Sequence, residues 1–166
     1  MSLDKNVRIL IVDDDENIRR TMQTIFENEG YVVDLATTGN EAIELTQERT
    51  YNIALLDIRL PDMEGVELLN LIKDNVPKTR KIMVTGYPSM QNAVSALNKN
   101  ADAYLIKPVG IESLLSTVKE QLRLQKEEKK FTEQKVAEFI ETRTRRNHLL
   151  MKSAREIGSE RRKIGN

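Results

Sequence analysis

Cysteine and tryptophan are both absent from the 166 residues, and a single histidine, His148, is present. Without cysteine the chain forms neither disulfides nor thiolate metal sites. No apolar run approaches the roughly 18 residues that a membrane-spanning helix needs, and no signal-peptide pattern opens the sequence. We therefore expect a protein that is neither inserted into a membrane nor secreted, and we place it in the cytoplasm.

Charged residues make up 31% of the chain and hydrophobic residues 39%, enough for one domain with its own core and an appendage. The charges are unevenly divided. Residues 1–120 carry 13 basic and 19 acidic side chains, whereas residues 121–166 carry 13 basic and 7 acidic ones. We expect a domain over 1–120 and a charged helical extension over 121–166. The extension could fold against the domain or bind an acidic partner, although a solvated helix face is the commoner cause of such a segment.

Short apolar runs alternate with stretches of helical periodicity over the first two thirds of the chain. Apolar, β-branched runs predict strands, and apolar residues three or four positions apart predict helices. The expected strands cover residues 7–12, 31–36, 53–56, 81–84 and 103–106. The expected helices run from about residue 18 up to Gly30, over 41–48, 66–74 and 90–98, and from 111 onward. Because short crossovers between parallel strands are right-handed and cover the sheet, this order predicts an α/β fold with helices on both faces.

The stretch from Ile53 to Gly65 carries the strongest functional signal. An apolar run of four residues ends at Asp57, and Pro61 and Gly65 follow within eight residues. This pattern predicts a buried strand that stops at a loop, with a carboxylate at the edge where open parallel sheets bind ligands. The plainer interpretation is that Asp57 caps the next helix, since aspartate is common where loops begin.

Four other polar residues also follow or end predicted strands. Asp13 and Asp14 follow the first strand, Thr85 the fourth and Lys107 the fifth, so all would meet Asp57 at one edge of the sheet. Three close carboxylates need a counter-ion, and oxygen ligands without cysteine or a nearby histidine favour Mg²⁺. Lys107 and the Thr85 hydroxyl would then bind an anion. The set predicts phosphoryl transfer, in which the Asp57 carboxylate attacks in line and forms an aspartyl phosphate.

Four motifs occur in one order and spacing: Ile-Val-Asp13-Asp14-Asp, Leu-Leu-Asp57-Ile-Arg-Leu-Pro61-Asp-Met-Glu-Gly65, Val-Thr85-Gly and Ala103-Tyr104-Leu-Ile-Lys107-Pro108. In this combination residues 5–120, about 70% of the chain, resemble the receiver domain of two-component response regulators, the family of the chemotaxis and nitrogen-regulation receivers. The resemblance implies a flavodoxin-like, doubly wound parallel sheet of five strands in the order 2-1-3-4-5.

The resemblance also implies roles for the site residues. Asp57 would accept a phosphoryl group from a sensor histidine kinase or a phosphotransfer protein. Asp14, Asp57 and the backbone carbonyl of Arg59 would bind Mg²⁺, with Asp13 assisting. The bond that follows Lys107, usually cis in the family, would aim the lysine at the phosphate.

Thr85 and Tyr104 match the switch pair of the family. The resemblance implies that the Thr85 hydroxyl moves toward the phosphate and that the Tyr104 ring turns inward behind it. The surface of the fourth helix, fifth strand and fifth helix would then change its affinity for a downstream protein. Such a chain is a signalling phosphoacceptor rather than an enzyme, because it catalyses only its own phosphorylation and dephosphorylation.

A Mg²⁺-dependent phosphohydrolase with an aspartyl nucleophile is the main alternative. Haloacid-type hydrolases place a second aspartate two residues after the nucleophile, where it serves as acid and base. Here that position holds Arg59, whose guanidinium does not release a proton at neutral pH. Position 59 therefore favours the signalling module.

The extension is rich in Glu, Lys, Gln, Arg and Leu, and it has no proline or glycine between Ile111 and Ile157. This composition predicts one long helix or two. A dimeric coiled coil and a helical hairpin that folds back are both open, and disorder at the very end is a further alternative. A heptad seam with a polar middle can be drawn through Leu115, Val118, Leu122, Gln125, Lys129, Thr132, Val136, Phe139, Arg143, Arg146, Leu150 and Ile157. Self-association into a homodimer is expected through Leu115, Val118, Leu122, Val136 and Phe139.

Basic residues gather at Arg143, Arg145 and Arg146, close to His148. Such charge is the electrostatic footprint of a nucleic-acid binder, but the segment lacks a helix-turn-helix pattern and stacking aromatics. A DNA-binding regulator is therefore kept as an alternative, and we do not expect nucleic acid or membrane as a partner. His148 could be a phosphorelay site, yet a lone histidine on a polar helix is more often a solvated surface residue.

Two large side chains frame the expected mouth of the site, since Arg59 lies two residues after Asp57 and Tyr87 two after Thr85. Both would shield the phosphorus from water, and Arg59 would hydrogen-bond the phosphoryl oxygens, so we predict slow autodephosphorylation. The alternative is that both side chains point into solvent, in which case Mg²⁺ and Lys107 alone set the lifetime. Arg59→Asn combined with Tyr87→Glu should speed phosphate loss roughly tenfold, about 1.4 kcal/mol of barrier. Decay of the phosphorylated protein at saturating Mg²⁺ measures this, and an unchanged rate would show that neither residue guards the phosphate.

Overall fold

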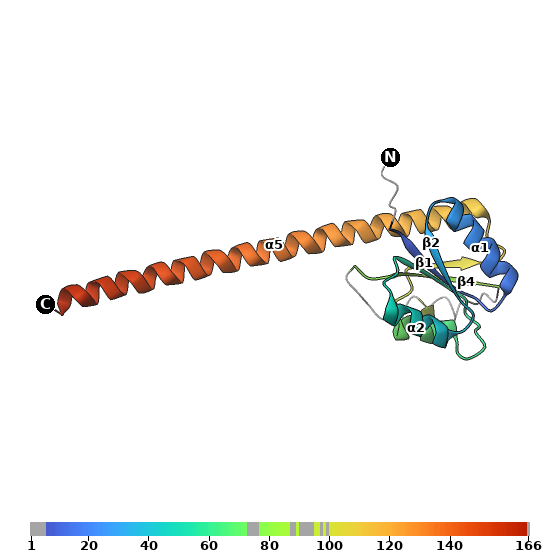
Figure 1. Ribbon diagram of the computed structural model, residues 1–166, viewed down its shortest axis with the longest axis horizontal. Helices are drawn as coiled ribbons and strands as arrows, with labels where there is room; N and C mark the ends of the chain where they lie inside the picture. Colours follow the sequence, from blue (N-terminus) through green and yellow to red (C-terminus); the bar gives the residue numbers. More distant parts are fainter. Residues whose placement is uncertain are drawn as a thin grey trace. The chain divides into compact units, whose positions relative to one another are not determined.

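The computed structural model describes residues 6–72, 77–86, 89, 95, 96, 98 and 100–165. Within these residues five strands alternate with helices along the chain (Figure 1). The strands are β1 (Arg8–Val12), β2 (Val32–Ala36), β3 (Ile53–Leu56), β4 (Arg80–Thr85) and β5 (Ala103–Ile106). The helices are α1 (Glu16–Asn28), α2 (Gly39–Glu48), α3 (Gly65–Leu71) and α5 (Ile111–Ile164).

The strand bounds lie within one residue of those expected from the sequence, and α1 and α2 begin about two residues earlier than expected. The helix expected over 66–74 is α3, which ends at Leu71. Most of the helix expected over 90–98 lies outside the described residues.

The sheet is parallel, and its strand order β2-β1-β3-β4-β5 confirms the predicted topology. Alternate residues of β1 point to opposite faces. Ile9 and Ile11 pack with apolar residues of α1 and α5, whereas Leu10 and Val12 pack with residues of α2 and α3. Figure 1 shows α1 and α5 on one side of the sheet and α2 on the other. Burial on both faces explains why the strands are continuous apolar runs.

Side-chain caps start two of the helices close to the ends of the preceding strands. Asp15 accepts a hydrogen bond from the backbone N–H of Ile18, and Thr38 accepts one from Glu41, both at 3.1 Å. Each bond satisfies a donor that the first helical turn leaves unpaired. Gly30, just beyond α1, has a φ of 87°, a conformation that suits glycine at the end of a helix. The caps keep the loops at the carboxyl edge short.

Helix α5 is continuous from Ile111 to Ile164, so the chain has no turn there that a helical hairpin would need. The structure divides into two compact units, Met1–Lys126 and Glu127–Asn166. This boundary falls later than residue 120, because Gln121 and Gln125 are still buried in the first unit. No helix in the described part of the chain is both long and apolar enough to cross a membrane.

The first part of the expected self-association seam is wrong. Val118 is fully buried and Leu122 is 9% exposed, and Leu115 packs against the same cluster of core residues. These side chains pack within the first unit, because this part of α5 covers one face of the sheet. Val118 and Leu122 are therefore not available to a second copy of the chain, and Leu115 is only partly so. Val136 and Phe139 belong to the second unit and are exposed.

Gln125 joins α5 to the segments that precede two strands. Its Oε1 accepts a hydrogen bond from Nδ2 of Asn52 at 3.0 Å, and its Nε2 donates to the carbonyls of Asn52 and Lys78 at 3.1 and 2.8 Å. Asn52 Oδ1 in turn accepts from the backbone N–H of Arg8 at 3.0 Å. Gln125 is 4% exposed, so these groups satisfy one another away from water.

Gln125→Ala should lower the free energy of unfolding by about 2–3 kcal/mol, because it leaves buried polar groups of Asn52 and Lys78 without their partner. Chemical denaturation of the full chain measures this loss. Gln134→Ala is the matched control, since it removes only an exposed 3.4 Å contact with Glu138. The control should change stability by less than about 0.5 kcal/mol. Equal losses in the two variants would contradict the role assigned to Gln125.

Candidate functional site

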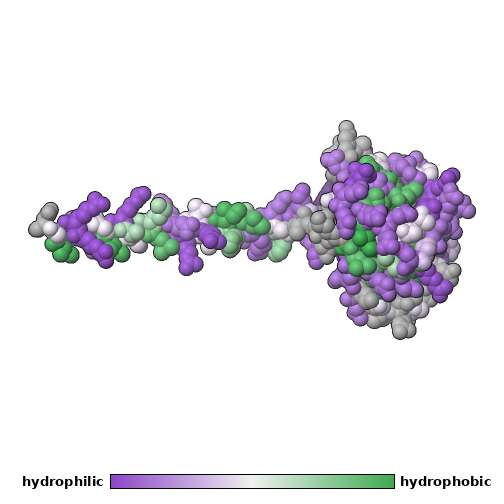
Figure 2. Space-filling model, turned by 60° about the horizontal axis from the view of Figure 1, so that its bottom comes forward, coloured by the Kyte–Doolittle hydropathy of each residue, from purple (hydrophilic) through white to green (hydrophobic). Residues whose placement is uncertain are grey.

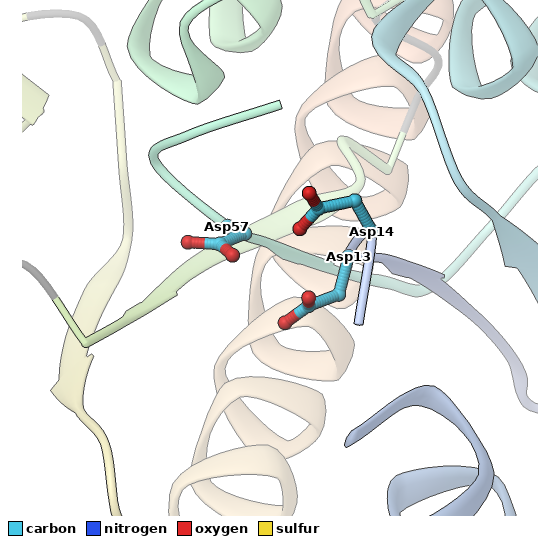
Figure 3. Close-up of side chains that lie close together, drawn as sticks. All are labelled: Asp13, Asp14 and Asp57. Atoms are coloured by element: carbon cyan, nitrogen blue, oxygen red, sulfur yellow. The ribbon is translucent and has the colours of Figure 1, made fainter. Parts of the chain in front are cut away.

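Three aspartates lie together at the carboxyl edge of the sheet. Asp13 and Asp14 follow β1 and Asp57 follows β3, the neighbouring strand. The backbone N–H of Asp57 donates to the carbonyl of Val12 at 2.9 Å, which continues the pairing of these strands to the site. One carboxylate oxygen of each aspartate lies within 4.8 Å of the others, and Figure 3 shows the three side chains gathered at the strand ends. The structure thus brings together the carboxylates that the sequence predicted.

Lys107 bonds to two of these carboxylates from the far side of β4. Its backbone N–H donates to the carbonyl of Thr85 at 2.8 Å, and the bond to Pro108 is cis, as the family resemblance implied. Its Nζ lies 2.6 Å from Oδ2 of Asp13 and 3.2 Å from Oδ2 of Asp57. Thr85, at the end of β4, is fully buried. Four strands therefore contribute to one site.

Burial and charge act in opposite directions on these groups. Burial, followed by the charge of Asp13, raises the pKa of Asp57, while Lys107 and the backbone amide of Arg59 oppose the rise. Burial would lower the pKa of Lys107, but its hydrogen bond to Asp13 and the charges of both carboxylates outweigh burial, and the pKa is raised. The ammonium therefore stays charged at neutral pH and supplies a fixed positive charge to the carboxylates.

One oxygen of Asp57 lacks a partner. Oδ1 is buried and makes no hydrogen bond within the described residues, whereas Oδ2 bonds to Lys107. A buried carboxylate oxygen costs free energy unless a donor or a cation meets it. One carboxylate oxygen from each of Asp13, Asp14 and Asp57 supplies an all-oxygen set that fits a hard divalent cation such as Mg²⁺. A cation would also offset charge that the single Lys107 leaves uncompensated.

The loop that follows Asp57 folds tightly back on itself. Arg59 and Glu64 form an antiparallel bridge, and the N–H of Gly65 donates to the carbonyl of Ile58 at 2.5 Å. A Cβ at Gly65 would lie 1.9 Å from the carbonyl oxygen of Asp57, closer than side chains ever approach. Position 65 requires glycine for lack of space, and this close approach fixes the backbone that carries Asp57.

Asp62 ties the same loop to the start of α2. Its two carboxylate oxygens accept hydrogen bonds from the backbone N–H groups of Gly39 and Asn40, both at 2.9 Å. These bonds lower the pKa of Asp62, as expected for an anion at the amino end of a helix. The neighbouring Met63 packs against Gly39, since a Cβ added to that glycine would lie 2.4 Å from the Met63 sulfur.

The remaining predicted residues differ in their placement. The side chain of Arg59 is exposed at the sheet edge. Tyr104 lies on β5, paired with Met83, and its hydroxyl is in buried surroundings that raise its pKa. Tyr87 lies outside the described residues. The prediction of a slow phosphate loss therefore stays a prediction.

Sequence reasoning missed Arg19 and Asp62. Arg19 donates to the backbone carbonyl of Asp13 at 2.8 Å, and Oδ1 of Asp13 accepts from the N–H of Asp15 at 2.9 Å, so two contacts hold the acidic loop. Arg19 lies on α1 and contacts a backbone carbonyl in the loop before that helix. Asp62 follows β3, but its partners are backbone amides at the start of α2. Periodicity and turn signals carry no information on such contacts.

The fold and the site together define a receiver domain of two-component signalling. The sequence model of the family described as "Response regulator receiver domain" matches residues 9–119. The chain belongs to this family, which confirms the predicted resemblance.

Similar proteins extend this result. A CheY-like receiver domain protein from Methanospirillum hungatei is 48% identical with a TM-score of 0.71, over 74% of this chain and 98% of that one. A response regulator protein from Burkholderia pseudomallei, solved with a phosphorylated aspartic acid, a calcium ion and citrate, is 30% identical with a TM-score of 0.63, over 74% and 73% of the two chains. The regulatory protein AtoC of Escherichia coli is 36% identical over 71% of this chain but 26% of its own. The chain thus matches about a quarter of that curated relative.

Gly65→Ala should lower the free energy of unfolding by about 1–3 kcal/mol, because the added methyl group overlaps the backbone of Asp57. Thermal or chemical denaturation measures the loss. Gly110→Ala is the matched control, since a Cβ there meets nothing within 4 Å. It should leave stability within about 0.5 kcal/mol of the parent chain. A Gly65→Ala protein as stable as the control would contradict the steric role of Gly65.

Proposed function

We propose that this chain is the phosphoacceptor of a two-component phosphorelay, in which Asp57 takes a phosphoryl group from a sensor histidine kinase or a phosphotransfer protein. One observation carries the proposal: three carboxylates lie within 4.8 Å of one another, and the Lys107 ammonium bonds to two of them. This set offers a nucleophile, oxygen ligands for a hard cation and a fixed positive charge, the parts that phosphoryl transfer requires.

Asp57 contributes the nucleophile through one of its oxygens. Oδ2 bonds to Lys107, while Oδ1 has no hydrogen-bond partner in the described part of the chain and is the oxygen we assign to attack. The new bond forms between Oδ1 and phosphorus as the bond from phosphorus to the donor histidine nitrogen breaks, and the electron pair of that bond stays on the nitrogen. Lys107 offsets the charge of the phosphoryl oxygens from a position fixed by Thr85.

Asp13, Asp14, Asp57 and, as the family resemblance implies, the backbone carbonyl of Arg59 would hold Mg²⁺. When bound, the ion stabilises negative charge on the transferring group. Arg19 contributes indirectly, because its bond to the Asp13 carbonyl steadies the acidic loop. The Burkholderia pseudomallei relative holds a phosphorylated aspartic acid and a calcium ion, which supports both an acceptor aspartate and the binding of a divalent cation.

Thr85 and Tyr104 are proposed to carry the change of state away from Asp57. Thr85 ends β4, where its carbonyl accepts a hydrogen bond from the N–H of Lys107, and Tyr104 lies on the adjacent β5. The Thr85 hydroxyl would move toward the phosphoryl oxygens and the Tyr104 ring would follow it inward. The receiver unit, which ends at Lys126, would then present a changed surface to a downstream protein, with the helical extension from Glu127 onward as the output segment.

A small-molecule phosphodonor with Mg²⁺ should add one phosphoryl group, at Asp57, because among the carboxylates that the structure describes only Asp57 combines a buried unpartnered oxygen with a contact to Lys107. Intact-mass spectrometry should show a single addition in the parent chain and none in Asp57→Asn, which keeps the shape but removes the nucleophilic charge. The same uptake in Asp57→Asn would place the phosphorylation elsewhere and overturn the proposal.

Asp14→Ala should raise the Mg²⁺ concentration that half-saturates phosphorylation by at least about tenfold, because the cation loses an anionic ligand. Asp15→Asn is the matched control, since Asp15 caps α1 and does not belong to the carboxylate cluster. Equal shifts in the two variants would show that general negative charge, rather than the cluster, sets the dependence on Mg²⁺.

A further inference from the structure

The second unit is a stretch of helix whose apolar side chains are uncovered. Each of these large side chains of α5 is at least 51% exposed: Phe131, Val136, Phe139, Ile140, Leu149, Leu150, Met151, Ile157 and Ile164. Figure 2 shows apolar patches along this segment, separated by hydrophilic side chains. A helix in water gains most of its stability from packing of an apolar face rather than from propensity. Packing of these side chains against a partner would therefore stabilise the helix.

Four of these residues, together with Ala154, share one seam along the helix, which differs from the heptad drawn from the sequence because Ile140 and Asn147 replace Phe139 and Arg146. Val136, Ile140, Leu150, Ala154 and Ile157 fall on the alternating steps of three and four residues that face a partner in a coiled coil. The intrahelical ion pairs between residues 134 and 154 lie off this seam: Lys135 with Glu138, and Arg145 with Glu141. Glu133, the seam position before Val136, pairs with Lys129, so the apolar part of the seam begins at Val136.

Two polar residues interrupt the seam and distinguish the two directions in which a second copy could pack. Arg143 and Asn147 occupy the seam positions between Ile140 and Leu150. In a parallel, in-register pair Arg143 would meet Arg143 of the other copy, which places like charges together where water is scarce. In an antiparallel pair centred between the two positions, Arg143 meets Asn147 of the other copy, and the amide oxygen can accept from the guanidinium.

The distribution of charge favours the same direction. Residues 127–142 carry three basic and five acidic side chains, whereas residues 143–166 carry eight basic and two acidic ones. Parallel packing would set the two basic halves side by side, while antiparallel packing sets each basic half against an acidic one. A polyanion such as a nucleic acid would match the basic half but would leave the apolar seam exposed.

We infer that the second unit pairs with that of another copy of this chain as an antiparallel coiled coil. In this register Val136 lies opposite Ala154 and Ile140 opposite Leu150, and the two-fold symmetry repeats each contact. The paired stretch over residues 136–154 measures about 28 Å at roughly 1.5 Å per residue. The pairing involves only the extension, so it does not depend on the phosphorylation of Asp57.

The direction of the helix pairing can be tested by disulfide cross-linking, because the chain has no native cysteine that could react with the introduced ones. Full-length Val136→Cys and Ala154→Cys proteins, mixed and oxidised, should form a disulfide-linked heterodimer, while each alone should not cross-link. Cross-linking of either variant with itself would show a parallel pair and overturn the inference. Absence of the heterodimer would overturn it too. Glu138→Cys mixed with Lys152→Cys is the matched control, since both residues lie off the seam in the same register and should not cross-link.

A charge on the seam should separate the two copies. Ile140→Asp should raise the dissociation constant of the dimer by at least about tenfold in sedimentation equilibrium, because it buries an unpaired carboxylate. Thr142→Asp adds the same charge two residues away and off the seam, so it should change the constant by less than roughly twofold. Equal effects of the two variants would disprove the pairing. A parent chain that stays monomeric at every concentration would disprove it too, even if the chain binds nucleic acid.

Discussion

A lysine that shares its charge between two buried carboxylates is the interaction on which the site depends. Without the Lys107 ammonium, Asp13 and Asp57 would be like charges at a poorly hydrated edge, and protonation of one of them would relieve the repulsion. A protonated Asp57 is a poor nucleophile. The parallel sheet makes the contact possible, because β1, β3 and β5 end at one edge and the lysine reaches past β4. The hydrogen bond from the Lys107 N–H to the Thr85 carbonyl fixes the backbone position from which the lysine side chain extends.

The part of the site that depends on strand ends could be predicted from the sequence. Asp57 and Lys107 each follow a short apolar run, and in a parallel sheet such positions share one edge, so order along the chain is enough to bring them together. The contacts of Asp62 and Gln125 could not be predicted in this way. Each bonds to backbone groups of a distant segment, and the choice of partner depends on how layers pack rather than on any local pattern. The need for glycine at position 65 likewise follows from an approach of two backbones.

Helix α5 shows why apolar spacing alone misleads. Val118 and Leu122 repeat at the steps of three and four residues that also describe Val136 and Ile140, yet the first two pack against the sheet and the last two are exposed. A helix uses the same spacing toward a domain core and toward another helix, so periodicity identifies a face without identifying its neighbour. The buried glutamines mark the difference. Gln121 and Gln125 are 7% and 4% exposed, and an amide so placed belongs beside the carbonyls at a sheet edge rather than in an apolar seam.

Asp62 and Met63 also connect the loop after Asp57 to the start of α2. The Met63 sulfur occupies the space that a side chain at position 39 would need, while Asp62 needs the two amides that open the helix. A side chain at position 39 would displace the end of the Met63 side chain, which is flexible and can move aside. The Asp62 bonds use backbone amides that every residue except proline provides, so the loop after Asp57 is held to α2 largely independently of the side chains at positions 39 and 40.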